Sequence, residues 1–97
     1  MENKPKCTID KYRTKRWVMN GQHHRLDGPA IVKNKQYMYF DRLDTLTDWY
    51  CHNVRIEKWM KINNIDPSNV SETDILFIKI TFGALDVNST KKLIYNL

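Results

Sequence analysis

The side chains with the most chemical potential lie in two short stretches of this chain. Residues 23–27 hold two histidines, an arginine and an aspartate, and Cys51-His52 forms a second pair. Histidine serves as a general base or a metal ligand, and cysteine serves as a nucleophile or a zinc ligand. The types of residue would therefore suit a zinc site or a Cys–His catalytic pair.

The spacing of these residues argues against both chemistries. Neighbouring strand residues point to opposite faces, so His23 and His24, or Cys51 and His52, do not converge on one atom unless the strand bends. The usual zinc-ligand spacings do not occur, and the chain's three glycines do not form a phosphate-binding loop. We expect no catalytic residue, no metal and no cofactor, while a zinc site using Cys7 stays an open alternative.

The same stretch suits a structural role in short β-hairpins. Asn20-Gly21 is the strongest two-residue hairpin signal because both positions tolerate positive φ. Asp27-Gly28-Pro29 is a turn sequence, since aspartate bonds locally, glycine is flexible and proline cannot donate to a ladder. We expect Arg25 or His24 to bridge to Asp27 or to a turn carbonyl and so to fix the hairpin edge.

The chain predicts strands followed by helices. Strands are expected at residues 12–19, 22–25, 30–33, 36–40, 49–51 and 54–56. Helices are expected at residues 56–63, 72–82 and 90–96. The middle helix is rich in β-branched residues that favour a strand, but Ser71 with Asp74 resembles a capping box and Gly83 suits a helix end.

This order of elements predicts an α+β fold, in which an antiparallel β-meander of stacked hairpins is followed by two or three short helices. We expect one domain with a polar N-terminal segment (1–10), a hairpin region (11–56) and a helical region (57–97) that packs on the sheet. Apolar runs are too short to span a bilayer, and the N-terminus does not resemble a signal peptide. We therefore expect a cytoplasmic protein with reduced cysteines and no membrane association.

Positive charge is concentrated in the first third of the chain. The formal net charge is +5, and residues 1–35 hold nine Lys and Arg against three acids, a local net charge of +6. The candidate nucleic-acid-binding residues flank Tyr12 and Trp17 and are Lys11, Arg13, Lys15 and Arg16. A solvated strand face around an inward Trp17 would have the same composition.

A second candidate surface is aromatic. Tyr37, Tyr39 and Phe40 lie in a predicted strand whose side chains alternate between faces, so some of them point away from the core unless a helix covers them. Exposed aromatic residues on a small sheet are typical of protein-binding surfaces.

A degenerate repeat links the two halves of the hairpin region. Residues 17–21 (WVMNG) can be laid over residues 49–53 (WYCHN), with the same spacing from tryptophan to turn. In both copies the tryptophan would anchor a hairpin by packing on the sheet face.

The first copy resembles a MORN-like repeat, W-x-x-N-G-x-x-H-R-x-D-G-P-A. The matching residues are Trp17, Asn20, Gly21, His24, Arg25, Asp27, Gly28, Pro29 and Ala30, and the second copy contributes Trp49, Tyr50, Asn53, Arg55 and Ile56. The second copy departs from the pattern, because His52-Asn53 stands where Asn-Gly is usual. The resemblance covers residues 16–63 and implies stacked hairpins, a bacteriophage origin and relatives among antitoxin-like proteins, but no reaction.

Together these observations predict a small non-catalytic phage-type protein that binds and modulates or inhibits a host protein, such as a defence, nuclease or toxin component, in the host cytoplasm. The alternative is a nucleic-acid-binding protein that uses the basic N-terminal strand region.

Overall fold

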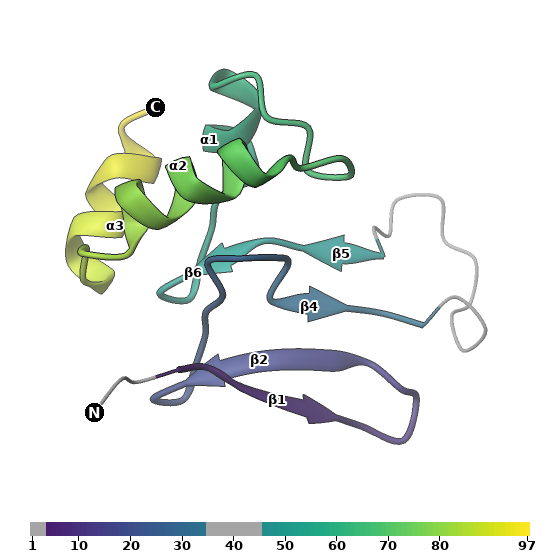
Figure 1. Ribbon diagram of the computed structural model, residues 1–97. Helices are drawn as coiled ribbons and strands as arrows, with labels where there is room; N and C mark the ends of the chain where they lie inside the picture. The colour runs from purple at the N-terminus through teal and green to yellow at the C-terminus, as the bar shows by residue number, and fades with distance from the viewer. Residues whose placement is uncertain (1–3, 35–45) are drawn as a thin grey trace.

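A computed structural model describes residues 4–34 and 46–97 and has the expected α+β architecture (Figure 1). The strands are β1 (Lys6–Ile9), β2 (Lys15–Met19), β3 (Gln22–His23), β4 (Ile31–Val32), β5 (Thr47–Asp48), β6 (Tyr50–Cys51) and β7 (Val54–Arg55). The helices are α1 (Glu57–Ile62), α2 (Glu72–Phe82) and α3 (Val87–Tyr95). Within these residues, no helix has the length and apolar character needed to cross a membrane.

All strand pairs in the described chain are antiparallel. The main sheet has the order β1-β2-β4-β5, with β3 also pairing with β2, and β6 pairs with β7 in a separate hairpin. Figure 1 shows the helices gathered at the β5–β6 end of the molecule, with β1 and β2 at the opposite end.

The two tryptophan hairpins, β2–β3 with Trp17 and β6–β7 with Trp49, have the same local structure. Asn20-Gly21 and His52-Asn53 all have positive φ angles, as a two-residue type I′ turn requires. The paired residues next to the turn are Met19 with Gln22 in one hairpin and Cys51 with Val54 in the other, so the register is also the same. The predicted repeat is therefore confirmed as a repeat of hairpin geometry, while its family resemblance stays a prediction.

The N-terminal segment differs from the prediction, because residues 6–9, placed before the hairpin region, form strand β1. The strand expected from Tyr12 begins only at Lys15. Asp10 explains both differences: its Oδ1 accepts hydrogen bonds from the backbone N–H groups of Tyr12 and Thr14, at 2.9 and 3.0 Å. This local turn, in which Arg13 has φ of 58°, joins β1 to β2 as a hairpin.

One observed strand was not predicted, and one predicted strand lies outside the described residues. Residues 47–48 were not among the expected strands but form β5, which pairs with β4. Its side chains do not alternate in polarity over a run long enough to indicate a strand. The strand predicted at residues 36–40 lies outside the described residues.

Helices α2 and α3 begin at side chains that cap them, whereas α1 has no side-chain cap. Helix α2 has the predicted bounds, and Ser71 and Asp74 form a reciprocal capping box. Helix α3 begins earlier than the predicted residue 90, because Asp86 provides the N-cap, with Oδ1 accepting from the Ser89 N–H at 2.7 Å. Leu97 lies beyond the helix and is exposed.

The hydrophobic core lies between the second hairpin and the helices. Its buried members are Trp49, Cys51, Val54, Ile56, Trp59, Met60, Ile65, Ile78, Phe82 and Ile94. By contrast, every residue of β1 is exposed, and β2 is at most half-buried. The molecule thus has a helical half with a packed core and a thin sheet that extends from it.

Candidate functional site

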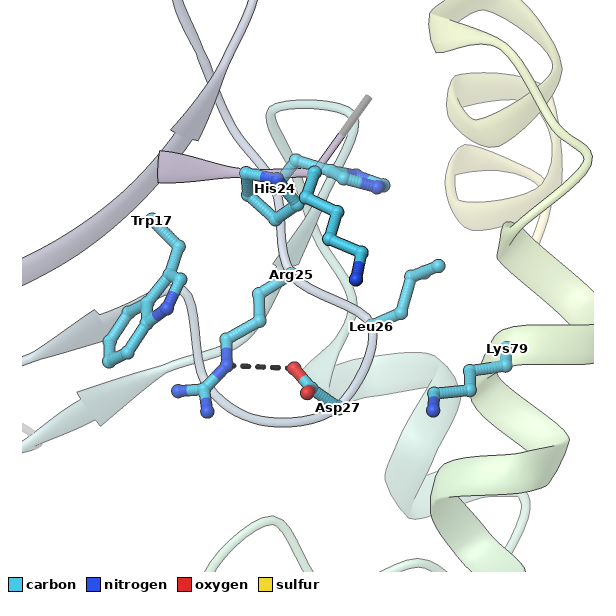
Figure 2. A pocket seen from close by; sticks show the side chains of 8 residues that line it. Trp17, His24, Arg25, Leu26, Asp27 and Lys79 are labelled. Carbon is cyan, nitrogen blue, oxygen red and sulfur yellow. Dashed lines mark hydrogen bonds and ion pairs between the residues drawn. The ribbon is translucent and has the colours of Figure 1, made fainter. Parts of the chain in front are cut away.

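An open groove of about 640 Å³ lies between the thin sheet and α2. Its lining residues come from four segments of the chain and are Lys4, Pro5, Trp17, His24, Arg25, Leu26, Asp27 and Lys79. Figure 2 shows Trp17 on the sheet side, Lys79 on the α2 side, and Leu26 with the Arg25–Asp27 pair between them. We name this feature the Trp17–Lys79 groove.

Arg25 is held at the floor of this groove by three contacts. Its Nε donates to Asp27 Oδ1 at 2.9 Å, and its Nη1 donates to the Pro29 carbonyl at 3.2 Å. The guanidinium also lies 3.8 Å from the centroid of the Trp17 ring, in a cation–π contact. The predicted structural bridge is therefore confirmed, with Arg25 as the donor to both the aspartate and the turn carbonyl.

Gly28 is required by this arrangement for lack of space, not for a special φ. A Cβ atom at position 28 would lie 2.6 Å from Cζ of Arg25, much closer than a van der Waals contact. Because three contacts fix the guanidinium, it cannot move aside without losing some of them. The Asp27-Gly28-Pro29 sequence thus holds Arg25 in place: Asp27 and Pro29 accept its hydrogen bonds, and Gly28 leaves room for its guanidinium.

His24, which lines the groove, is hydrogen-bonded to His52 of the second hairpin. His24 is 4% exposed, and its Nδ1 accepts from the His52 backbone N–H at 2.9 Å. The His52 Nε2 bonds to the Phe82 carbonyl at 3.0 Å, and since a carbonyl only accepts, this nitrogen carries the proton. Burial, reinforced by His52, lowers the pKa of His24 from 6.5 to about 4. His24 is thus a neutral hydrogen-bond acceptor at pH 7, linking the first hairpin to the second.

Cys51 does not have the environment of a nucleophile. It is buried, and its Sγ lies 3.6 Å from the Arg25 carbonyl, to which the thiol donates. Burial raises the pKa of this thiol to about 12, so the thiolate does not form at neutral pH. Cys7 is exposed on β1, and both cysteines are free. In residues 4–34 and 46–97, no three Cys, His, Asp or Glu side chains cluster as a metal site would require.

The groove combines apolar surface with positive charge. Arg25, Lys4 and Lys79 contribute cationic groups, and the one acidic lining residue, Asp27, is engaged with Arg25. Trp17 and Leu26 provide apolar surface between the charges. The arrangement is suited to holding an extended segment with an acidic side chain and an apolar neighbour.

The four basic residues predicted to bind nucleic acid do not share one strand face. Lys11 and Arg13 lie in the turn between β1 and β2, and Lys15 and Arg16 are consecutive residues of β2, so they point to opposite faces. Arg16 is also paired with Asp10, with Nη1 2.7 Å from Oδ2. Arg13 also does not share a strand face with Trp17, because residue 13 precedes the strand.

The remaining predicted residues divide into two groups. The candidate aromatic surface of Tyr37, Tyr39 and Phe40 lies outside the described residues. Trp49 is buried in the core, where its Nε1 donates to the Pro67 carbonyl at 3.1 Å, and Tyr50 is half-buried beside Arg55. Both second-copy residues therefore belong to the scaffold.

Sequence reasoning missed half of the groove. Lys4, Pro5, Leu26 and Lys79 carried no motif, because their role depends on β1 and α2 meeting the 24–27 segment in space. Only Leu26 could have been noticed in the sequence, because it is an apolar residue inside a polar turn sequence. Its side chain packs against the core.

Comparisons of this chain with protein-family models, with curated proteins and with solved structures found no match.

Proposed function

We propose that this chain is a small non-catalytic protein that acts by binding and modulating another protein, and that the partner contacts it in the Trp17–Lys79 groove. The single observation that supports this most is the groove's composition, in which Lys4, Arg25 and Lys79 line the same surface as the half-buried Trp17 and Leu26. Tryptophan and arginine are enriched at protein interfaces, and complementary charge steers association. The fitting partner presents an acidic segment.

The structural use of the reactive residues is consistent with a binding role. His24 is a buried acceptor, Cys51 is a buried thiol, and Arg25 is fixed by Asp27 and Pro29. A nucleophile with a base and an orienting group within reach is the usual requirement for covalent catalysis, and these residues are committed to other contacts. From the repeat resemblance, the proposal extends to a phage-type protein, related to antitoxin-like proteins, that acts on a host defence, nuclease or toxin protein in the host cytoplasm.

Nucleic-acid binding is the second candidate function. The observation in its favour is the excess of positive charge in residues 1–35, part of which lines the groove. Phosphate binding by lysine and arginine is strongly salt-dependent and tolerant of sequence. An acidic protein segment and a phosphate backbone would use the same cationic groups, so an experiment must separate them.

A capture experiment from host lysate with and without nuclease makes this separation. We expect one protein to be retained stoichiometrically by the full chain, and retention to survive nuclease treatment. Loss of all retained material after nuclease, with a steep decrease of binding as salt rises, would reject the protein-partner function in favour of nucleic acid.

A further inference from the structure

Helix α2 is apolar on two opposite faces. On its inner face, Ile78 and Phe82 are fully buried in the core. On its outer face, Leu76, Phe77 and Ile80 are 58%, 43% and 72% exposed. An apolar face of a helix is normally buried against another element.

The exposed residues form one continuous stripe. Thr73, Leu76, Phe77 and Ile80 follow the i, i+3, i+4, i+7 spacing that places side chains on one face of a helix. We name these four residues the α2 stripe. The Phe77 ring packs edge-on against Trp59 of α1, with ring centroids 5.1 Å apart, so the stripe is joined to the core. Figure 1 shows α2 at the front of the helical layer, with no described element in front of it.

Charges beside the stripe indicate what covers it. Glu72 and Lys79 are both exposed, and their seven-residue separation places them on the same flank of the stripe. The midpoint between them lies one residue from the midpoint of the stripe, about 1.5 Å along the helix axis. When two identical helices pack antiparallel, residues on the same flank face each other. Glu72 of one copy then lies opposite Lys79 of the other, twice in the interface.

We infer that the α2 stripe binds the α2 stripe of a second copy of this chain, with the two helices antiparallel about a twofold axis. Such an interface is self-complementary, as a symmetric dimer requires. It joins apolar faces at the centre and opposite charges at both ends. The contact is small for a protein interface, so the dimer is reversible and its population depends on concentration. This inference does not depend on the function proposed for the groove, although Lys79 belongs both to this flank and to the groove lining.

Charge reversal tests the antiparallel arrangement directly. Sedimentation equilibrium of the full chain, up to high micromolar concentration, gives the dimer Kd. Lys79→Glu and Glu72→Lys each place like charges opposite one another at both ends, and we expect each to raise the Kd about tenfold. The double variant restores both pairs, so its Kd should return close to that of the original chain.

Ile80→Asp tests the apolar contact. Ile80 is 72% exposed in the single chain, so aspartate there leaves the fold intact, which helix content by circular dichroism verifies. We expect complete loss of the dimer. Ile9→Asp is the matched control, because Ile9 is 62% exposed on β1, away from α2, and its dimer should be unchanged.

Three results would overturn the inference. The first is a chain that is monomeric at every concentration. The second is a dimer that Ile80→Asp does not affect. The third is a dimer that Ile80→Asp abolishes but in which the double charge variant binds no better than the single ones, since this excludes the antiparallel pairing.

Discussion

The two tryptophan hairpins share their local structure but differ in what surrounds them. In each, the residue seven positions after the tryptophan donates its N–H to the tryptophan carbonyl at 3.0 Å, His24 to Trp17 and Ile56 to Trp49. Trp49 is 2% exposed in the core. Trp17 is half-buried, and its ring is covered by the Arg25 guanidinium.

The residues that follow each hairpin account for this difference. After the second hairpin, Ile56 is fully buried and α1 begins at once, so helices close over Trp49. After the first hairpin, the polar segment 24–29 bends around Arg25 and leaves the groove open. Equal hairpins therefore serve different purposes: one forms the core, and the other carries the candidate binding surface.

The largest expected effect distinguishes the two tryptophans. Trp49→Ala removes a buried ring and should lower the free energy of unfolding by about 3–5 kcal/mol, which is a large part of the stability of a small domain. Trp17→Ala should cost only about 1–2 kcal/mol, since the ring is half-buried and loses mainly the Arg25 contact. Urea denaturation of both variants measures the difference. Equal losses would contradict the distinction between core and groove hairpins.

The next effect is the pH dependence that comes from His24. Its pKa is lowered in the folded chain, so below pH 6.5 the unfolded chain takes up the proton first and stability falls until about pH 4. The slope contributed by this group is at most about 1.4 kcal/mol per pH unit, and above pH 6.5 it contributes no slope.

Two variants isolate this contribution from that of the carboxylates. His24→Gln keeps a neutral acceptor and should flatten the stability profile between pH 6.5 and 4, as measured by urea denaturation at each pH. His23→Gln is the neighbouring control and should keep the slope. A profile that is unchanged in His24→Gln would show that the buried histidine is not the titrating group.

A smaller effect tests whether Arg25 needs the space that Gly28 leaves for its guanidinium. Gly28→Ala should displace the guanidinium and cost about 1–2 kcal/mol through lost hydrogen bonds. In an Arg25→Ala background the same substitution should cost much less, and this double-mutant cycle measures the coupling. Gly21→Ala serves as a control, because its cost of about 1 kcal/mol comes from a left-handed φ of 74° and should be the same in both backgrounds.

The smallest effect is expected at Asp27. Its side chain is 60% exposed, and an exposed ion pair is worth about 0–1 kcal/mol. Asp27→Ala should therefore shift the thermal midpoint by a few degrees at most. A loss as large as that of Gly28→Ala would show that Asp27, and not the space at position 28, holds Arg25 in place.

The sequence predicted local structure better than assembly. The turns at 20–21 and 27–29, the capping box at Ser71 and the bridge from Arg25 all depend on residues close in the chain, and each was predicted correctly. Strand β1 is a local exception: it was missed because the turn that pairs it with β2 has Arg13, and not glycine or asparagine, at a positive φ. The groove was missed because the sheet and α2 form its walls only when folded.

The most direct test of the central claim compares capture by three forms of the full chain from nuclease-treated cell lysate. Lys4→Glu reverses a charge of the groove without touching the α2 stripe, and Lys91→Glu reverses an exposed lysine on α3 as a control. We predict one stoichiometric protein partner for the original chain and for Lys91→Glu, bound about tenfold more weakly by Lys4→Glu. Equal binding of that partner by all three forms would contradict the groove as the binding site.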